Sequence, residues 1–105
     1  MSKETDYTNL EKLESAVCDL LGWNPKGYHR AACREGKRTR KYYDVRCCIS
    51  AAAYVNYGYT YEEIAKFYNK TRTNISRSLT VIGNLASVYP EVKEILDKVM
   101  AIRVE

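Results

Sequence analysis

Apolar residues recur every three or four positions along most of the chain, which is the spacing of amphipathic helices. The first such stretch begins at Thr8, which forms a helix-capping pattern with Glu11 three residues later, and it ends at Gly22. A helix is therefore predicted between Thr8 and Gly22. Its expected apolar face consists of Leu10, Leu13, Val17, Leu20 and Leu21.

Two further helices are predicted in the middle of the chain. The first opens at Pro25, a residue type favoured in the first helical turn, and runs through Cys33 to a stop at Gly36. After the basic sequence GKRTRK, the segment YYDVRCCISAAAYVNY predicts a longer helix that ends at Gly58. The stripe expected to face the core consists of Val45, Cys48, Ile49, Ala52 and Val55.

A short helix, a turn and a longer helix are predicted next. Thr60 and Glu63 form a second capping pattern, so TYEEIAKFY predicts a short helix. Its inward residues are expected to be Ile64, Ala65 and either Phe67 or Tyr68. Asn69 and Lys70 fit a turn, and Thr71 can cap the following helix. The buried side of that helix is predicted to carry Ile75, Leu79, Ile82 and Ala86, and the opposite side Thr73, Arg77, Thr80 and Asn84.

The whole pattern predicts an all-α fold of about six helices. The last helix is expected from about Pro90, with an apolar face of Val92, Ile95, Leu96, Val99 and Met100. No strand pattern and no internal repeat is found. A chain of 105 residues is long enough for one domain and too short for two, so we expect a single domain over residues 1–105. This excludes a multidomain enzyme.

The composition indicates a soluble protein that does not enter a membrane. Hydrophobic residues make up 46% of the chain, enough to fill a core, but no apolar run approaches the length of a membrane span. The N-terminal sequence MSKETDYTNLEK has acidic residues where an export signal has a basic and then an apolar region. A cytoplasmic location is therefore expected.

Positive charge is concentrated in two segments. The net charge is +4 overall, but residues 26–46 carry a net +6 and residues 66–77 a net +4 with no acidic residue. The other parts of the chain are therefore acidic. Such segregation presents a basic surface to an anionic partner, and nucleic acid is the leading candidate, with a solvated loop as the alternative for GKRTRK.

Residues 60–86 have the pattern of a helix-turn-helix, in which the second helix enters the major groove of DNA. The leading end of that helix is polar and basic. Arginine suits the two acceptors of guanine, asparagine suits adenine, and threonine offers a hydroxyl and a methyl group. No carboxylate occurs from Lys66 to Tyr89 to repel phosphate. The alternative is a plain antiparallel helix pair with a solvated outer face.

Four stretches of the sequence carry a resemblance to a known family. They are GKRTRK, VRCCISAAAYV, Glu63-Ile64-Ala65, and FYNKTRTNI from Phe67 to Ile75. In these stretches the chain resembles the C-terminal DNA-binding domain of the bacterial replication initiator DnaA, whose helix-turn-helix fold is shared with the Trp repressor. Members have a basic loop, an alanine-rich helix opened by arginine, a Glu-Ile-Gly step and the signature F-G-G-R-D-H-T-T-V. The resemblance extends from about Leu13 to Arg103.

The resemblance implies a domain that binds double-stranded DNA, with some sequence preference, in replication or its regulation. It implies groove contact by Lys70, Thr71, Arg72, Thr73 and Asn74, and phosphate or minor-groove contact by Lys37, Arg38, Arg40, Lys41 and Arg46. Arg77 is added to the groove contacts because, like Arg72, Thr73 and Asn74, it supplies hydrogen-bonding chemistry at the leading end of the second helix. Tyr68 and Asn69 replace the two glycines of the signature. Thr71 and Arg72 replace its aspartate and histidine, which changes the hydrogen-bonding pattern. We therefore expect a target different from the initiator's own site.

No motif for nucleotide binding or catalysis is found. The phosphate-binding pattern G-x-x-x-x-G-K-[ST] is absent from the sequence, so neither a nucleotide nor another cofactor is expected. The single histidine, His29, has no serine or acidic residue at a recognisable catalytic spacing, and no enzymatic activity is expected. A metal cluster of His29 and Cys33 with Cys47 or Cys48 is an alternative, but the four cysteines, with Cys18, are expected to be free and buried.

Two other functions stay open on the sequence alone. A protein-interaction module that kept the initiator fold could dock a replication or repair partner. Tyrosines near the third and fourth helices could also stack on single-stranded bases, although packing at the helix junctions is the expectation. These tyrosines are Tyr54, Tyr57, Tyr59, Tyr61 and Tyr68.

Overall fold

The residues described by the computed structural model fold into six helices and contain no strand. Those residues are 5–33 and 40–104. The predicted all-α class is therefore confirmed. The helices are α1 (Thr8–Leu21), α2 (Pro25–Cys33), α3 (Arg40–Tyr57), α4 (Tyr61–Tyr68), α5 (Arg72–Val88) and α6 (Pro90–Ala101).

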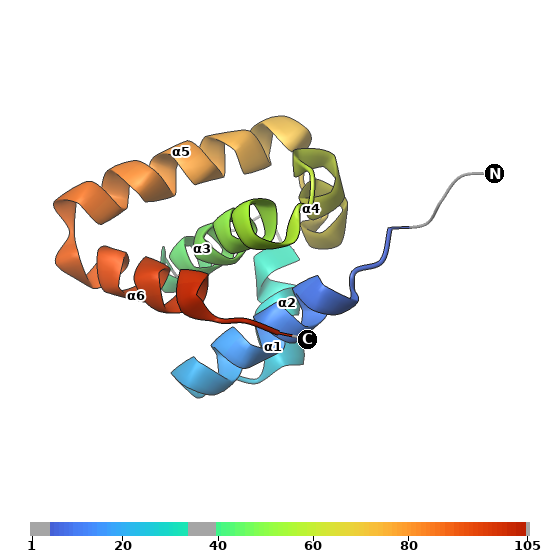
Figure 1. The fold of residues 1–105 in the computed structure, drawn as a ribbon, viewed down its shortest axis with the longest axis horizontal. Helices are drawn as coiled ribbons and strands as arrows, with labels where there is room; N and C mark the ends of the chain where they lie inside the picture. The colour runs from blue at the N-terminus through green and yellow to red at the C-terminus, as the bar shows by residue number, and fades with distance from the viewer. Residues whose placement is uncertain (1–4, 34–39, 105) are drawn as a thin grey trace.

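Helix α3 is the centre of the fold. It packs against all five other helices, and in Figure 1 it lies between the long helices α5 and α6. Its fully buried apolar residues are mostly small, which lets neighbouring helices approach closely on several sides. They are Val45, Cys47, Cys48, Ile49, Ala52 and Ala53. The prediction that Val55 also faces the core is wrong, because the buried face turns toward Ala53 at this end of α3 and leaves Val55 63% exposed.

The first helix has the predicted extent but not the predicted cap. Thr8 is its first residue, and the carboxylate of Asp6 accepts hydrogen bonds from the backbone N–H of Thr8, at 2.9 Å, and from its hydroxyl. The helix ends at Gly22 in the left-handed conformation, as predicted. Leu20 is 53% exposed rather than buried, since its side of the last turn extends past the core.

The start of α4 confirms the second predicted capping box. The hydroxyl of Thr60 accepts the backbone N–H of Glu63 at 3.1 Å, and the carboxylate of Glu63 accepts the backbone N–H of Thr60 at 2.9 Å. Two donors at the helix N-terminus are thereby satisfied. Ile64, Ala65 and Tyr68 are buried, whereas Phe67 is partly buried.

Three residues, 69–71, connect α4 to α5. Asn69 adopts the left-handed conformation, with φ of 56°, which asparagine tolerates better than other residues that have a side chain. Thr71 then caps α5, because its hydroxyl accepts the backbone N–H of Asn74 at 3.1 Å. The predicted turn and the predicted cap are both confirmed.

The rotation of α5 about its own axis is set by its buried face. Ile75, Ser78 and Ile82 are buried where α5 packs against α3, α4 and α6, while Leu79 and Ala86 are only partly buried. The predicted outer residues Thr73, Arg77, Thr80 and Asn84 are all exposed. The predicted outer face of α5 is therefore confirmed, and its predicted buried side is confirmed at Ile75 and Ile82.

This packing gives Ile75 a larger part in stability than Leu79. Replacing the fully buried Ile75 with alanine is expected to lower the free energy of unfolding by about 2–5 kcal/mol, because the lost contacts leave a cavity. Leu79→Ala is expected to lower the free energy of unfolding by less. Replacing the exposed Thr80 with alanine is expected to change it by no more than about 0.5 kcal/mol. Urea denaturation measures all three, and equal effects would contradict the assigned rotation of α5.

Candidate nucleic-acid interface

The first two turns of α5 present a polar and basic surface. Arg72, Thr73, Asn74 and Arg77 are exposed there, opposite the buried Ile75. Neither Arg72 nor Arg77 forms an ion pair within the part of the chain that the structure describes. The unpaired N–H groups at a helix N-terminus add partial positive charge at the same end. This face can therefore receive an anionic partner.

The two residues before α5 have further roles. The hydroxyl oxygen of Thr71 caps the helix, so Thr71 shapes the surface as well as being exposed on it. Lys70 is partly buried, and its backbone N–H bonds to the carbonyl of Ala65 at 2.8 Å, which closes the end of α4. Both residues therefore hold the turn that places Arg72 at the start of the exposed face.

Arg46 lies elsewhere than predicted. It was expected to contact phosphate or the minor groove, but it is only 6% exposed, because α3 is covered there by its neighbours. Its guanidinium stands 5.1 Å from the ring centre of Tyr43 and donates from Nη2 to the side-chain oxygen of Asn74 at 3.4 Å. The guanidinium of Arg46 therefore supports the Asn74 side chain by a hydrogen bond and is not presented at the surface to an anion.

The bond from Arg46 determines what Asn74 can offer. A guanidinium only donates, so the Asn74 atom facing it is the oxygen Oδ1, and the Ser78 hydroxyl is also 3.4 Å from that oxygen. The amide NH₂ is the other end of the side chain. Asn74 therefore suits an acceptor, such as guanine N7 or O6 or thymine O4, better than the two-bond pairing with adenine that the sequence suggested.

The predicted basic loop lies largely outside the described residues. This applies to Lys37 and Arg38, while Arg40 and Lys41 are described only as the first residues of α3. The contact between Arg46 and Asn74 brings α3 beside the first turn of α5. Arg40 is six residues before Arg46, which corresponds to roughly 9 Å along a helix. Arg40, the first residue of α3, is therefore about two turns before the residue of α3 that contacts Asn74.

Most tyrosines near α3 and α4 pack at helix junctions, as predicted. Tyr59 and Tyr68 are buried, and the hydroxyl of Tyr57 donates to the carbonyl of Ile102 at 3.2 Å. Tyr54 is different, since it is 44% exposed and stacks on Tyr61 with 4.7 Å between ring centres. Tyr61 is partly buried, so the exposed part of this pair is mainly the ring of Tyr54.

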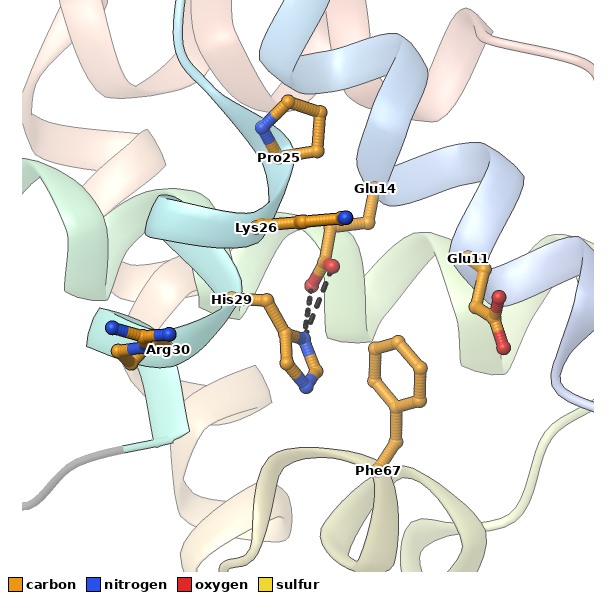
Figure 2. A pocket seen from close by; sticks show the side chains of 7 residues that line it. All are labelled: Glu11, Glu14, Pro25, Lys26, His29, Arg30 and Phe67. Atoms are coloured by element: carbon orange, nitrogen blue, oxygen red, sulfur yellow. Dashed lines mark hydrogen bonds and ion pairs between the residues drawn. The ribbon is translucent and has the colours of Figure 1, made fainter.

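A second polar site lies away from α5, where α1, α2 and α4 meet. His29 Nδ1 is 3.0 and 3.1 Å from the two carboxylate oxygens of Glu14, and Figure 2 shows the two side chains facing each other. They lie at a hollow of about 540 Å³. The hollow is lined by Glu11, Glu14, Pro25, Lys26, His29, Arg30 and Phe67. On its other nitrogen, Nε2, His29 meets Cys33 Sγ at 3.4 Å.

The structure gives His29 an acidic partner, Glu14, that the spacing of residues in the sequence does not indicate. Glu14 is fifteen residues earlier and comes from another helix, so no local spacing indicates the pair. One signal was available: Glu14 lies between Leu13 and Val17, close to the apolar stripe of α1, and a carboxylate placed there needs a partner.

The cysteines are free, as predicted, but they differ in burial. Cys18, Cys47 and Cys48 are fully buried, whereas Cys33 is partly exposed. Burial raises the pKa of Cys18 to about 11 and that of Cys48 to about 12, so both are protonated at neutral pH. Within the described ranges, no three His, Cys, Asp or Glu side chains are grouped to hold a metal ion.

No family model, curated protein or solved structure matches the chain. Among the helices described, none combines the length and apolar character that crossing a membrane requires. The function is therefore argued from the two sites themselves.

The Glu14–His29 pair predicts a pH-dependent stability. Burial raises the pKa of Glu14 above 4.5, and His29 opposes this only in part. The folded protein then holds this proton more tightly than the unfolded chain, so the Glu14 contribution is fully present below pH 4.5 and is lost as pH rises through the folded pKa. Glu14→Gln stays neutral. In urea titrations, the free energy of unfolding of Glu14→Gln minus that of the wild type is expected to increase from pH 4 to pH 7. A difference that does not depend on pH would contradict this.

Proposed function

We propose that this protein binds double-stranded DNA, with the N-terminal half of α5 in the major groove. The observation that carries the proposal is the exposed face of Arg72, Thr73 and Arg77 on a helix whose opposite face is anchored in the core. A short helix and a three-residue turn precede it, which is the arrangement of a helix-turn-helix. A groove about 12 Å wide admits such a helix.

The side chains of this face match the chemistry of a duplex. Arg72 and Arg77 can pair with guanine acceptors or neutralise phosphate, and Thr73 offers a hydroxyl and a methyl group. Asn74 accepts from Arg46 through Oδ1, which leaves its NH₂ to donate to base acceptors. Apart from the buried Arg46, the cations predicted for phosphate or minor-groove contact are Lys37, Arg38, Arg40 and Lys41, and we assign them to phosphate contact. Lys70 stays among the predicted groove contacts.

The resemblance to the DnaA C-terminal domain also supports DNA binding through α5. Asn69 occupies the position of the second signature glycine, and its left-handed conformation is one that glycine adopts without strain. Arg72 stands at the family's histidine position, so the preferred DNA sequence differs from that of the initiator. By this resemblance we place the protein in DNA replication or its regulation.

A salt titration of duplex binding tests the proposal and separates it from the protein-interaction alternative. Affinity for a random duplex is measured by fluorescence anisotropy at several salt concentrations. Neutralised phosphates release counterions, so the logarithm of the affinity should fall linearly with the logarithm of salt, with a slope that corresponds to about 4 to 8 contacts. Absence of binding, or affinity that ignores salt, would favour the interaction module.

Arg72 is the residue whose loss should alter sequence preference. At duplexes selected from a random pool, Arg72→Ala is expected to weaken binding by about 1–3 kcal/mol and to relax the preference. Lys93→Ala is the matched control, because it removes the same charge from the exposed side of α6. If Arg72→Ala changes affinity and preference no more than Lys93→Ala does, α5 is not the recognition helix.

A further inference from the structure

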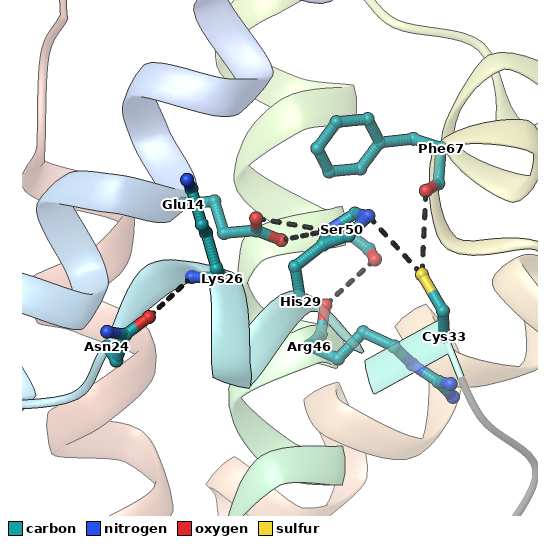
Figure 3. A network of polar contacts seen from close by, with 8 residues as sticks. All are labelled: Glu14, Asn24, Lys26, His29, Cys33, Arg46, Ser50 and Phe67. Atoms are coloured by element: carbon teal, nitrogen blue, oxygen red, sulfur yellow. Dashed lines mark hydrogen bonds and ion pairs between the residues drawn. The ribbon is translucent and has the colours of Figure 1, made fainter. Parts of the chain in front are cut away.

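Three side chains from two helices form a chain of contacts that DNA binding does not use. Glu14 of α1 meets Nδ1 of His29, and Nε2 of His29 meets Sγ of Cys33 one helical turn later on α2 (Figure 3). An ionised carboxylate can only accept a hydrogen bond, so Nδ1 carries the imidazole proton. Nε2 of the neutral ring then has a free lone pair, and that lone pair faces the thiol.

The site is open to small molecules on one side. The His29 side chain is 34% exposed beside the hollow of about 540 Å³, whereas the Glu14 side chain beneath it is 8% exposed. Cys33 is partly exposed, while Cys18, Cys47 and Cys48 are fully buried. Of the four thiols, Cys33 is therefore the most accessible to a dissolved reagent, and it is also the one that lies beside His29.

The surrounding charges explain why a base is needed. Burial and the charge of Glu14 raise the pKa of Cys33, and the cations Lys70 and Arg46 oppose them only in part. Cys33 is therefore protonated at neutral pH, and little of it is present as the reactive thiolate. Its reactivity depends on transfer of the proton to a neighbour, and His29 Nε2 at 3.4 Å is placed to accept it.

We infer that Cys33 is a nucleophilic thiol site for small disulfides, with His29 as its base and Glu14 as the residue that positions His29. Cys33 Sγ attacks one sulfur of the disulfide R–S–S–R while its proton passes to His29 Nε2. The S–S bond of the reagent breaks, Cys33–S–S–R forms, and the departing R–S⁻ takes the proton to give R–SH. Cys33 is oxidised and the departing sulfur is reduced, so no further reagent is required.

The contact of Cys33 with α4 defines where the added group would lie. Sγ is also 3.8 Å from the carbonyl oxygen of Phe67, near the end of α4 (Figure 3). A mixed disulfide would therefore occupy the junction between α2 and α4. This modification goes beyond the proposed DNA binding, and its test uses no DNA.

Reaction with the chromogenic disulfide 5,5′-dithiobis(2-nitrobenzoate) tests the site in the whole folded protein. One equivalent of thiol should react in a fast phase at pH 7, and mass spectrometry should locate the label on Cys33. Cys33→Ser should abolish the fast phase, and His29→Gln should slow it at least tenfold. Glu14→Gln should slow it as well, whereas Glu91→Gln, which changes an exposed carboxylate of α6, should not. First labelling at another cysteine, or an unchanged rate in His29→Gln, would overturn the assignment.

The pH profile separates base assistance from simple loosening of the structure. In the wild type, the Cys33 rate should rise much less than tenfold per pH unit between about pH 7 and 9, because His29 Nε2 at 3.4 Å, rather than hydroxide, accepts the thiol proton. In His29→Gln the rate should rise about tenfold per pH unit over the same range, as expected of an unassisted thiol below its pKa. Identical profiles, or new labelling of the buried Cys18 in His29→Gln, would mean that His29 only supports the packing, and the proposal would fail.

Discussion

The burial of one face of α5 against α3, α4 and α6 is the constraint on which the functional surface depends. Ile75 and Ile82 can be removed from water in only one rotation of the helix. That rotation turns Arg72 and Arg77 outward, and the Thr71 cap fixes where the helix begins. The exposed charge is therefore a consequence of hydrophobic packing.

Helix α3 links this surface to the rest of the molecule. Because it touches every other helix, a side chain on α3 can reach beneath a neighbour, and Arg46 does so when it donates to Asn74. A buried guanidinium requires such acceptors, so the contact serves folding and orients the amide at the same time. The thiol site adjoins the C-terminal end of α4, where the carbonyl of Phe67 is near Cys33.

The sequence predicted what depends on local spacing. The capping residues Thr60 and Thr71, the turn at Asn69 and the outer face of α5 follow from patterns within a few residues, and the structure confirms them. The capping box predicted from Thr8 and Glu11 does not form, because the backbone N–H of Thr8 donates to Asp6 and not to the carboxylate of Glu11.

Features set by tertiary contacts were not predictable in this way. A periodic pattern identifies an apolar face but not where the core ends, so Leu20 and Val55 were wrongly placed inside. The burial of Arg46 on α3 depends on packing against other helices, among them α5, which carries Asn74. The contact between Glu14 and His29 likewise joins residues of two helices, α1 and α2. Such pairings require the three-dimensional arrangement.

The most direct measurement of the central claim is an amide NMR titration of the ¹⁵N-labelled protein with a duplex at low salt. We expect the largest shift changes at residues 71–77, where backbone and side chains would meet the groove, and small changes along α1 and α6. Changes centred on α1 or α6 with residues 71–77 unaffected, or no change at all, would contradict it.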